Sequence, residues 1–146
     1  MTDAPSPEQV VRAVMDGIAR GAWGELHQWY AEDAVVEHRF ALPAPTRLEG
    51  REAIRVYFER SARAPLTLAV RNMTVHQTAD PEVVIAEWDY EVTAPGQSAE
   101  VANIQVSRVR DGLIVASRDY HNHFALAEAV GAAPRLLAAM GYPVRE

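Results

Sequence analysis

The sequence of 146 residues contains no cysteine and no lysine. The absence of cysteine excludes disulfide bonds and thiol chemistry. The absence of lysine excludes Schiff-base catalysis, because that mechanism needs a side-chain amine. The sequence also lacks the glycine-rich motifs that bind the phosphates of nucleotide cofactors. We therefore predict a protein that uses no cofactor.

The charge pattern and the hydrophobic pattern exclude two further classes of partner. The net charge is −6 and no basic stripe is present, which argues against nucleic-acid binding. No apolar run has the length of a membrane span, and the first residues lack the basic and apolar regions of a signal peptide. We expect a cytoplasmic protein with a single domain over residues 1–146, large enough for a real core.

The segregation of the predicted elements indicates an α+β fold. Ser6 and Gln9 form a capping box that starts a helix at Pro7, and Asp111-Gly112 is a hairpin turn. Pro43 and Pro45 indicate a loop. Most of the predicted helices precede a series of consecutive strands, whereas in a doubly wound sheet helices and strands alternate. The expected strands are Ala34–Phe40, Leu66–His76, Val83–Thr93, Glu100–Arg110 and Leu113–His121, and the expected helices are one from Pro7 to about Gly21, a short one with Trp23 and Leu26, Arg51–Arg63, and a tail from Leu126 to Met140.

The last predicted strand carries Asp119 and His121 within an otherwise apolar stretch. Side chains two residues apart on a strand share a face, so a carboxylate and an imidazole would point the same way. Such a pair suits acid–base chemistry. His38, on the first strand, can also transfer protons because histidine titrates near neutrality. The alternatives are an exposed strand end for Asp119 and a hydrogen-bonded core histidine for His38.

For the predicted strand Val83–Thr93, two assignments of the buried face are possible. Glu87 and Asp89 share one face of their strand, and Trp88 and Tyr90 share the other. Burial of the aromatic side chains is the default, because an unpaired buried carboxylate is costly. The opposite arrangement would place Asp89 in a pocket.

Uncharged polar side chains on the following strand can orient a carbonyl group. Asn103 and Gln105 share a face there. On the predicted helices, Trp23 and Tyr57 are expected as pocket wall or helix-side core.

The possibility of a metal site comes from the alternation of Asp119, His121 and His123, which is a spacing that metal ligands could have. Asn122, however, should end the strand between the two histidines. We therefore predict no metal site.

Three local patterns resemble the SnoaL-like branch of the nuclear transport factor 2-like superfamily. Tyr30–His38 is similar to the first-strand signature of ketosteroid isomerases. Asp111–Ile114 followed by Arg118–Tyr120 is similar to the last hairpin of limonene epoxide hydrolases, and Arg118–Asn122 with the tail Gly141–Arg145 resembles phenazine-biosynthesis A/B-type proteins. The resemblance implies a cone-shaped fold in which a curved, mainly antiparallel sheet encloses a deep pocket closed by helices.

The resemblance assigns roles residue by residue, and no single family's catalytic set is complete. Asp119 matches the catalytic aspartate of the epoxide hydrolases, and Asp89 matches their second aspartate. Glu87 stands where their arginine should be, Val36 replaces their tyrosine, and His38 replaces both their asparagine and the isomerases' general base, while Gln105 lies near the isomerases' oxyanion-site acid.

We predict a cofactor-independent isomerase or cyclase that acts on a small apolar metabolite, in secondary metabolism as the resemblance implies. Asp119, His38 and Asp89 are the predicted catalytic residues, and Asn103, Gln105, His121, Trp23 and Tyr57 are the predicted substrate-binding residues. The alternatives are an epoxide-opening hydrolase and a non-catalytic binding or scaffold module. An outward apolar set that includes Trp88 and Tyr90 predicts a homodimer through the sheet.

Overall fold

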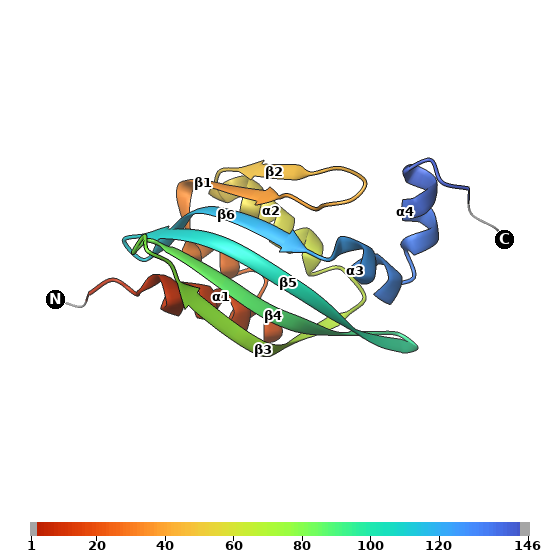
Figure 1. Ribbon diagram of the computed structural model, residues 1–146, viewed down its shortest axis with the longest axis horizontal. Coiled ribbons are helices and arrows are strands. Elements are labelled where there is room, and N and C mark those ends of the chain that lie inside the picture. Colours follow the sequence, from red (N-terminus) through yellow and green to blue (C-terminus); the bar gives the residue numbers. More distant parts are fainter. Residues whose placement is uncertain (1–2, 144–146) are drawn as a thin grey trace.

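The computed structural model describes residues 3–143. Predictions that use Met1, Thr2, Val144 or Arg145 lie outside the described residues. Within these residues the chain forms four α-helices, a 3-10 turn and one six-stranded sheet (Figure 1). The helices are α1 (Pro7–Ala19), α2 (Arg51–Ser61), α3 (His123–Ala129) and α4 (Ala133–Ala139), with the 3-10 turn η1 (Leu26–Trp29).

The sheet is antiparallel except for one pair of strands. Its strands are β1 (Tyr30–His38), β2 (Thr46–Glu49), β3 (Thr67–Gln77), β4 (Val83–Ala94), β5 (Gln97–Arg110) and β6 (Leu113–His121). Their order across the sheet is β2-β1-β6-β5-β4-β3, and β1 runs parallel to β6. The first and last strands of the chain are therefore neighbours near the middle of the sheet. This arrangement confirms the predicted α+β class.

Helix α1 covers the concave face of the sheet because its sequence is amphipathic. The predicted capping box is present: the Ser6 backbone N–H donates to Gln9 Oε1 at 2.8 Å, and the Gln9 backbone N–H donates to Ser6 Oγ at 3.2 Å. Val10, Val14 and Ile18 recur at helical spacing and are buried. Helix α2 lies over β1 and η1 on the same side of the sheet (Figure 1).

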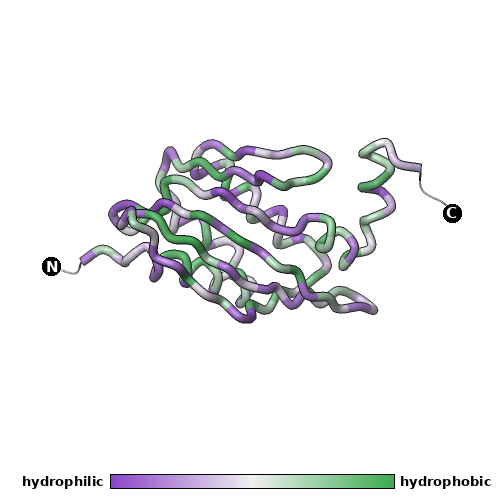
Figure 2. The backbone as a smooth tube through the Cα atoms, in the orientation of Figure 1, coloured by the Kyte–Doolittle hydropathy of each residue, from purple (hydrophilic) through white to green (hydrophobic). Residues whose placement is uncertain are grey.

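Hydrophilic and hydrophobic residues alternate along the strands (Figure 2). On β4 the inward residues include Trp88 and Tyr90, which are 2% and 8% exposed. The prediction that Asp89 faces the pocket as a catalytic residue is therefore wrong, and the arrangement expected from the cost of burying a carboxylate is the one observed. Trp88 and Tyr90 also leave the outward apolar set on which the homodimer was predicted. Ile104 and Tyr120 remain on the outer face, and the homodimer stays a prediction.

Several boundaries differ from those predicted. Strand β2 was expected to be loop, because four mostly polar residues after two prolines give no strand pattern. It forms because its backbone pairs with β1. β1 begins at Tyr30, where the acidic residues that follow hide the alternation. β3 is irregular near its middle: Asn72 has a φ of 55° and the register shifts between Arg71 and Thr74.

The C-terminal helices are short, and they differ in how they meet the rest of the protein. Helix α3 contacts β4 and β5, whereas α4 contacts α3 and stands away from the sheet (Figure 1). Within residues 3–143, no helix is both long and apolar enough to span a bilayer.

Candidate active site

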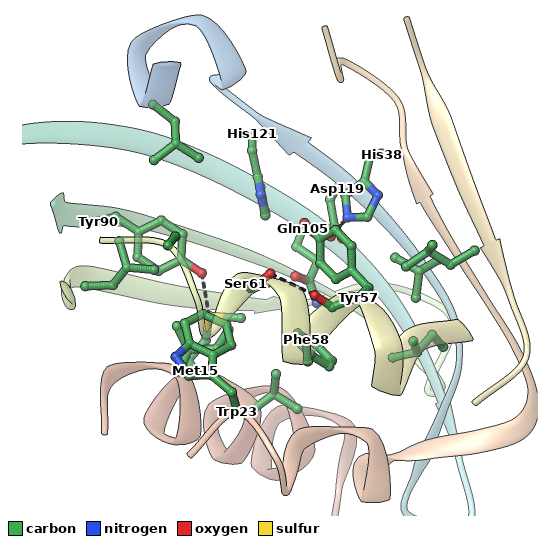
Figure 3. A pocket seen from close by; sticks show the side chains of 18 of the residues that line it. Met15, Trp23, His38, Tyr57, Phe58, Ser61, Tyr90, Gln105, Asp119 and His121 are labelled. Atoms are coloured by element: carbon green, nitrogen blue, oxygen red, sulfur yellow. Dashed lines mark hydrogen bonds and ion pairs between the residues drawn. The ribbon is translucent and has the colours of Figure 1, made fainter. Parts of the chain in front are cut away.

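A cavity of about 180 Å³ lies between the concave face of the sheet and helices α1 and α2 (Figure 3). Its wall is mostly apolar and aromatic, and its polar groups gather where β1, β5 and β6 meet. The lining residues are Val14, Met15, Ile18, Trp23, Tyr30, Val36, His38, Leu48, Ile54, Tyr57, Phe58, Ser61, Ala64, Leu66, Leu68, Tyr90, Gln105, Asp119, His121 and Leu126. No arginine is among them, although the sequence has 14.

Asp119 is the central polar group, and it is only 7% exposed. Its Oδ2 lies 3.5 Å from Nε2 of His38, and its Oδ1 accepts a hydrogen bond from Ser117 Oγ at 2.7 Å. His38 is equally buried, and its Nδ1 lies 3.2 Å from Thr46 Oγ1 on β2. The strand predicted as loop therefore holds the outer nitrogen of the imidazole, so that the inner nitrogen faces Asp119.

The register of three strands brings these groups together. His38 on β1 is level with Asp119 on β6, because the parallel pairing aligns them. Across the other edge of β6, Gln105 is opposite Asp119, and Ser107 is opposite Ser117. The four polar side chains that β5 and β6 contribute here point inward and are buried: Gln105, Ser107, Ser117 and Asp119. Gln105 Nε2 donates to Ser107 Oγ at 2.8 Å, which fixes its amide.

A bulge in the last hairpin aims Asp119 into the cavity. The Asp111-Gly112 turn pairs Arg110 with Leu113, but the register shifts by one residue between Arg108 and Val109. The extra residue on β6 is Val115, and beyond it the inward positions are Ser117 and Asp119. Without the shift, Asp119 would lie on the outer face, because a change of one residue exchanges the faces of a strand.

Asp119 and His38 form the central pair of the site. Burial shifts the pKa of each in the direction that favours its neutral form. Burial raises the pKa of Asp119 above its ordinary value, and the nearby His38 and the Ser117 hydroxyl oppose that shift. Burial lowers the pKa of His38, and Asp119 opposes that shift. A carboxylate with a raised pKa is a stronger base than one in water, which suits proton removal from carbon.

His121 lies farther along the same face of β6 and is held by aromatic rings. Its ring lies edge-on to Trp88, with centroids 5.5 Å apart and an interplanar angle of 81°. It is close to parallel with the ring of His123, with centroids 6.1 Å apart. Burial lowers the pKa of His121 to about 4, and repulsion from His123 adds to this shift. The imidazole is therefore neutral at pH 7.

Three phenols complete the wall around Asp119. Burial raises the pKa of Tyr30 and Tyr90, and it raises that of Tyr57 to about 12. The negative charge of Asp119 adds to the shift in each case. The Tyr57 ring also lies 4.9 Å from the His38 ring, between centroids. These phenols therefore stay protonated and uncharged at pH 7. They add no charge to the cavity wall beyond that of Asp119 and His38.

The structure brings together most of the predicted site residues and separates two of them. Asp119, His38, Gln105, His121, Trp23 and Tyr57 all line the cavity. Asp89 does not: it lies on the outer face, where Asn72 Nδ2 donates to its Oδ2 at 2.9 Å. Asn103 is buried, but its Nδ2 donates to the Val101 carbonyl at 2.8 Å and it is not part of the cavity wall.

The separation follows from the β4–β5 register. Asp89 is opposite Ala102, and Asn103 is opposite Trp88, so Asp89 and Asn103 lie on different faces of the sheet. Sequence reasoning also did not assign Ser117 to the site. Its position two residues before Asp119 on the same strand was the signal that could have found it.

The described residues do not form a metal site. No group of three or more histidine, aspartate or glutamate side chains within residues 3–143 is placed to hold a metal ion. As predicted, Asn122 interrupts the alternation, since it caps α3 by accepting a hydrogen bond from the Ala125 backbone N–H at 3.0 Å.

Comparison with known proteins gives consistent matches. The model of the SnoaL-like domain family matches residues 11–117. An uncharacterized PhzA/B-like protein of Pseudomonas aeruginosa is 34% identical over 124 residues, which is 83% of this chain and 84% of that protein. A solved structure from Bacillus subtilis, provisionally assigned as an isomerase, is 31% identical with a TM-score of 0.76 and covers 86% of this chain and 93% of its own.

A phenazine biosynthesis-related protein from Pseudomonas aeruginosa shares the fold at lower identity. It is 18% identical with a TM-score of 0.71, covering 96% of this chain and 83% of that chain. The family match spans well over half of the sequence and confirms the resemblance found in it. The chain belongs to the SnoaL-like domain family.

Proposed function

We propose that this protein is a cofactor-independent enzyme that moves a proton on a small, uncharged, largely apolar molecule, as an isomerase or a cyclase. One observation carries the proposal: a buried carboxylate, Asp119, lies at the polar end of an apolar cavity with an imidazole nitrogen 3.5 Å away. Asp119 is the base that removes a proton from carbon. His38 orients the carboxylate and stabilises its negative charge.

The cavity supports an uncharged substrate. Its wall offers no arginine to pair with a carboxylate or a phosphate, and Asp119 would repel either group. The apolar wall can accept a compact hydrocarbon frame, and the polar groups of β5 and β6 can accept or donate hydrogen bonds at one end of it. The provisional isomerase assignment of the Bacillus subtilis structure agrees with this chemistry.

The alternatives have less support. Epoxide opening of the limonene epoxide hydrolase kind would draw on Asp89, which lies on the outer face, and on an arginine at the position of Glu87. A scaffold module would not need a buried carboxylate, because burying one costs several kcal/mol unless it is compensated. Asp119 and His38 both line the same cavity, which favours an enzyme.

The test uses an enolisable ketone of the right size, 2-tetralone, in deuterated buffer. Proton NMR would follow the exchange of its α-protons with solvent deuterium. Wild-type protein should accelerate the exchange, and Asp119→Asn should reduce the acceleration by about a hundredfold or more, since general-base catalysis contributes roughly that much.

Asp89→Asn is the matched control, because it makes the same change on the outer face of the same sheet. It should exchange at the wild-type rate. Equal rates for the wild-type protein and Asp119→Asn, with both folded by circular dichroism, would refute the assignment of Asp119.

A further inference from the structure

The Nε2 atom of His121 is buried and has no hydrogen-bond partner among the described residues. The side chain lines the cavity and points into it beside Tyr90 and Gln105 (Figure 3). A buried polar atom without a partner costs about 1–3 kcal/mol. A bound molecule that supplies the missing partner would recover this free energy, so the atom marks a point where a ligand's polar group is expected.

The aromatic rings around His121 fix the direction of that nitrogen. Trp88 meets the imidazole edge-on at 5.5 Å, Tyr90 meets it edge-on at 6.3 Å, and His123 lies alongside it at 6.1 Å, measured between centroids. With neighbours on several sides, the imidazole has little freedom to turn away from the cavity. A group held in this way makes its hydrogen bond without a further cost of ordering.

The spacing between His121 and Asp119 matches one kind of reacting group. Two residues along a strand span about 7 Å, and both side chains point to the same face. A base about 3 Å from an α-carbon, and a donor about 3 Å from the carbonyl oxygen, are separated by a similar distance. Only two covalent bonds lie between the α-carbon and that oxygen.

We propose that His121 donates its Nε2–H to the carbonyl oxygen of an uncharged, enolisable ketone while Asp119 removes the α-proton. The inference rests on the proposed function and names the substrate class. As the Cα–H bond breaks, the proton passes to the Asp119 carboxylate. The electron pair forms a carbon–carbon double bond, and the oxygen takes the negative charge. When the oxygen re-forms the carbonyl group, the electron pair returns to carbon and Asp119 gives the proton back. In a simple ketone the proton returns to the α-carbon, which is the exchange reaction. In a ketone whose enolate is conjugated with a further carbon–carbon double bond, the proton goes to the far carbon of that double bond, which completes an isomerisation.

The electrostatics of His121 suit this role. With a pKa lowered to about 4 by burial and by His123, the imidazole carries one hydrogen at neutral pH and cannot neutralise Asp119 as a cation. Because His121 is neutral, it forms no ion pair with Asp119 that would weaken the carboxylate as a base. Neutral histidine serves the same purpose in triosephosphate isomerase, a general precedent for the chemistry.

The experiment compares two ligands that differ only in the carbonyl group, 2-tetralone and tetralin. Protein NMR titrations would give both affinities for the wild-type protein, His121→Leu and His121→Gln. Wild-type protein should bind 2-tetralone at least tenfold more tightly than tetralin. His121→Leu should lose that preference, and His121→Gln should retain much of it, because its amide N–H reaches a similar position.

The exchange reaction gives the second measurement. In His121→Leu the turnover number should fall by about a hundredfold or more, with a smaller change in KM, since a single oxyanion donor contributes roughly this much to turnover. His76→Gln is the control, because His76 lies on the outer face with its Nε2 2.7 Å from Glu87. It should match the wild-type protein in both measurements.

The outcomes separate this inference from the proposed function. If His121→Leu keeps the ligand preference and the exchange rate while Asp119→Asn loses exchange, His121 is not the donor and the proposed function stands. If wild-type protein prefers 2-tetralone through His121 but exchanges no α-protons, the carbonyl site is present and the proton-transfer function fails. A wild-type protein without any preference for 2-tetralone overturns the inference.

Discussion

The two faces of the sheet put the same kinds of residue to different uses. On the outer face, polar and charged groups pair across neighbouring strands in solvent, as Arg71 does with Glu91 at 3.0 Å and His76 with Glu87 at 2.7 Å. On the inner face, Asp119 and His38 meet in a buried, mostly apolar cavity. Exposed pairs contribute about 1 kcal/mol or less, whereas burial changes the acid–base behaviour of the inner pair. Residue type alone therefore does not identify a functional group in this protein.

The largest expected effect concerns the inner face of β4. Trp88→Ala should lower the free energy of unfolding by about 3–5 kcal/mol, because it leaves a large void in the core. Ile104→Ala removes a side chain that is 40% exposed on the outer face of β5 and should cost about 1 kcal/mol or less. Urea unfolding of both variants gives the comparison. Similar losses for the two would mean that the faces are less distinct than the burial of Trp88 indicates.

The second effect tests whether the inner pair acts as one unit. His38→Ala and Asp119→Asn should each slow α-proton exchange, and the double variant should be little slower than Asp119→Asn alone. Residues that act together show such strong non-additivity, here about 2.7 kcal/mol for a hundredfold effect. The measurement is a double-mutant cycle on the exchange rate. Strictly additive losses would show that His38 serves the fold and not the reaction.

The smallest effect is a pH dependence of stability to which His121, on the inner face, contributes. The pKa of His121 is about 4 in the folded protein and about 6.5 when unfolded. The unfolded chain therefore binds more protons between these values, so His121 reduces stability as the pH falls from about 6.5 toward 4. His121→Gln should flatten that decline by roughly 2 kcal/mol between pH 7 and about pH 5. An unchanged decline in His121→Gln would contradict the assignment.

The sequence predicted the fold class and the central residues, for reasons that the structure makes clear. The capping box at Ser6 and the Asp111-Gly112 turn are local signals, and both are present. Asp119 and His38 were identified by strand spacing and family resemblance, and both line the cavity. The turn at Pro95-Gly96 is a local signal that determines which residues of β5 share a face with Asp89. A two-residue turn pairs Ala94 with Gln97, and that register sets Asp89 opposite Ala102.

Other features could not be read from the sequence because they depend on contacts between distant segments. The bulge that turns Asp119 inward leaves no mark in the residues around Val115. Strand β2, whose Thr46 contacts His38, exists only because β1 offers it a partner. The unpartnered nitrogen of His121 likewise depends on the rings of Trp88 and Tyr90, which come from another strand.

The parallel pairing of β1 with β6 has a consequence for the order of assembly during synthesis. β1 leaves the ribosome early, but its neighbour in the sheet is the last strand to be made. Until β6 arrives, β1 has only the four residues of β2 beside it, and one of its edges is open to pairing with other chains. Contacts between such distant segments form slowly. The closing of the sheet and the joining of His38 to Asp119 are thus the same event, so the chemistry becomes available only to chains that have finished folding.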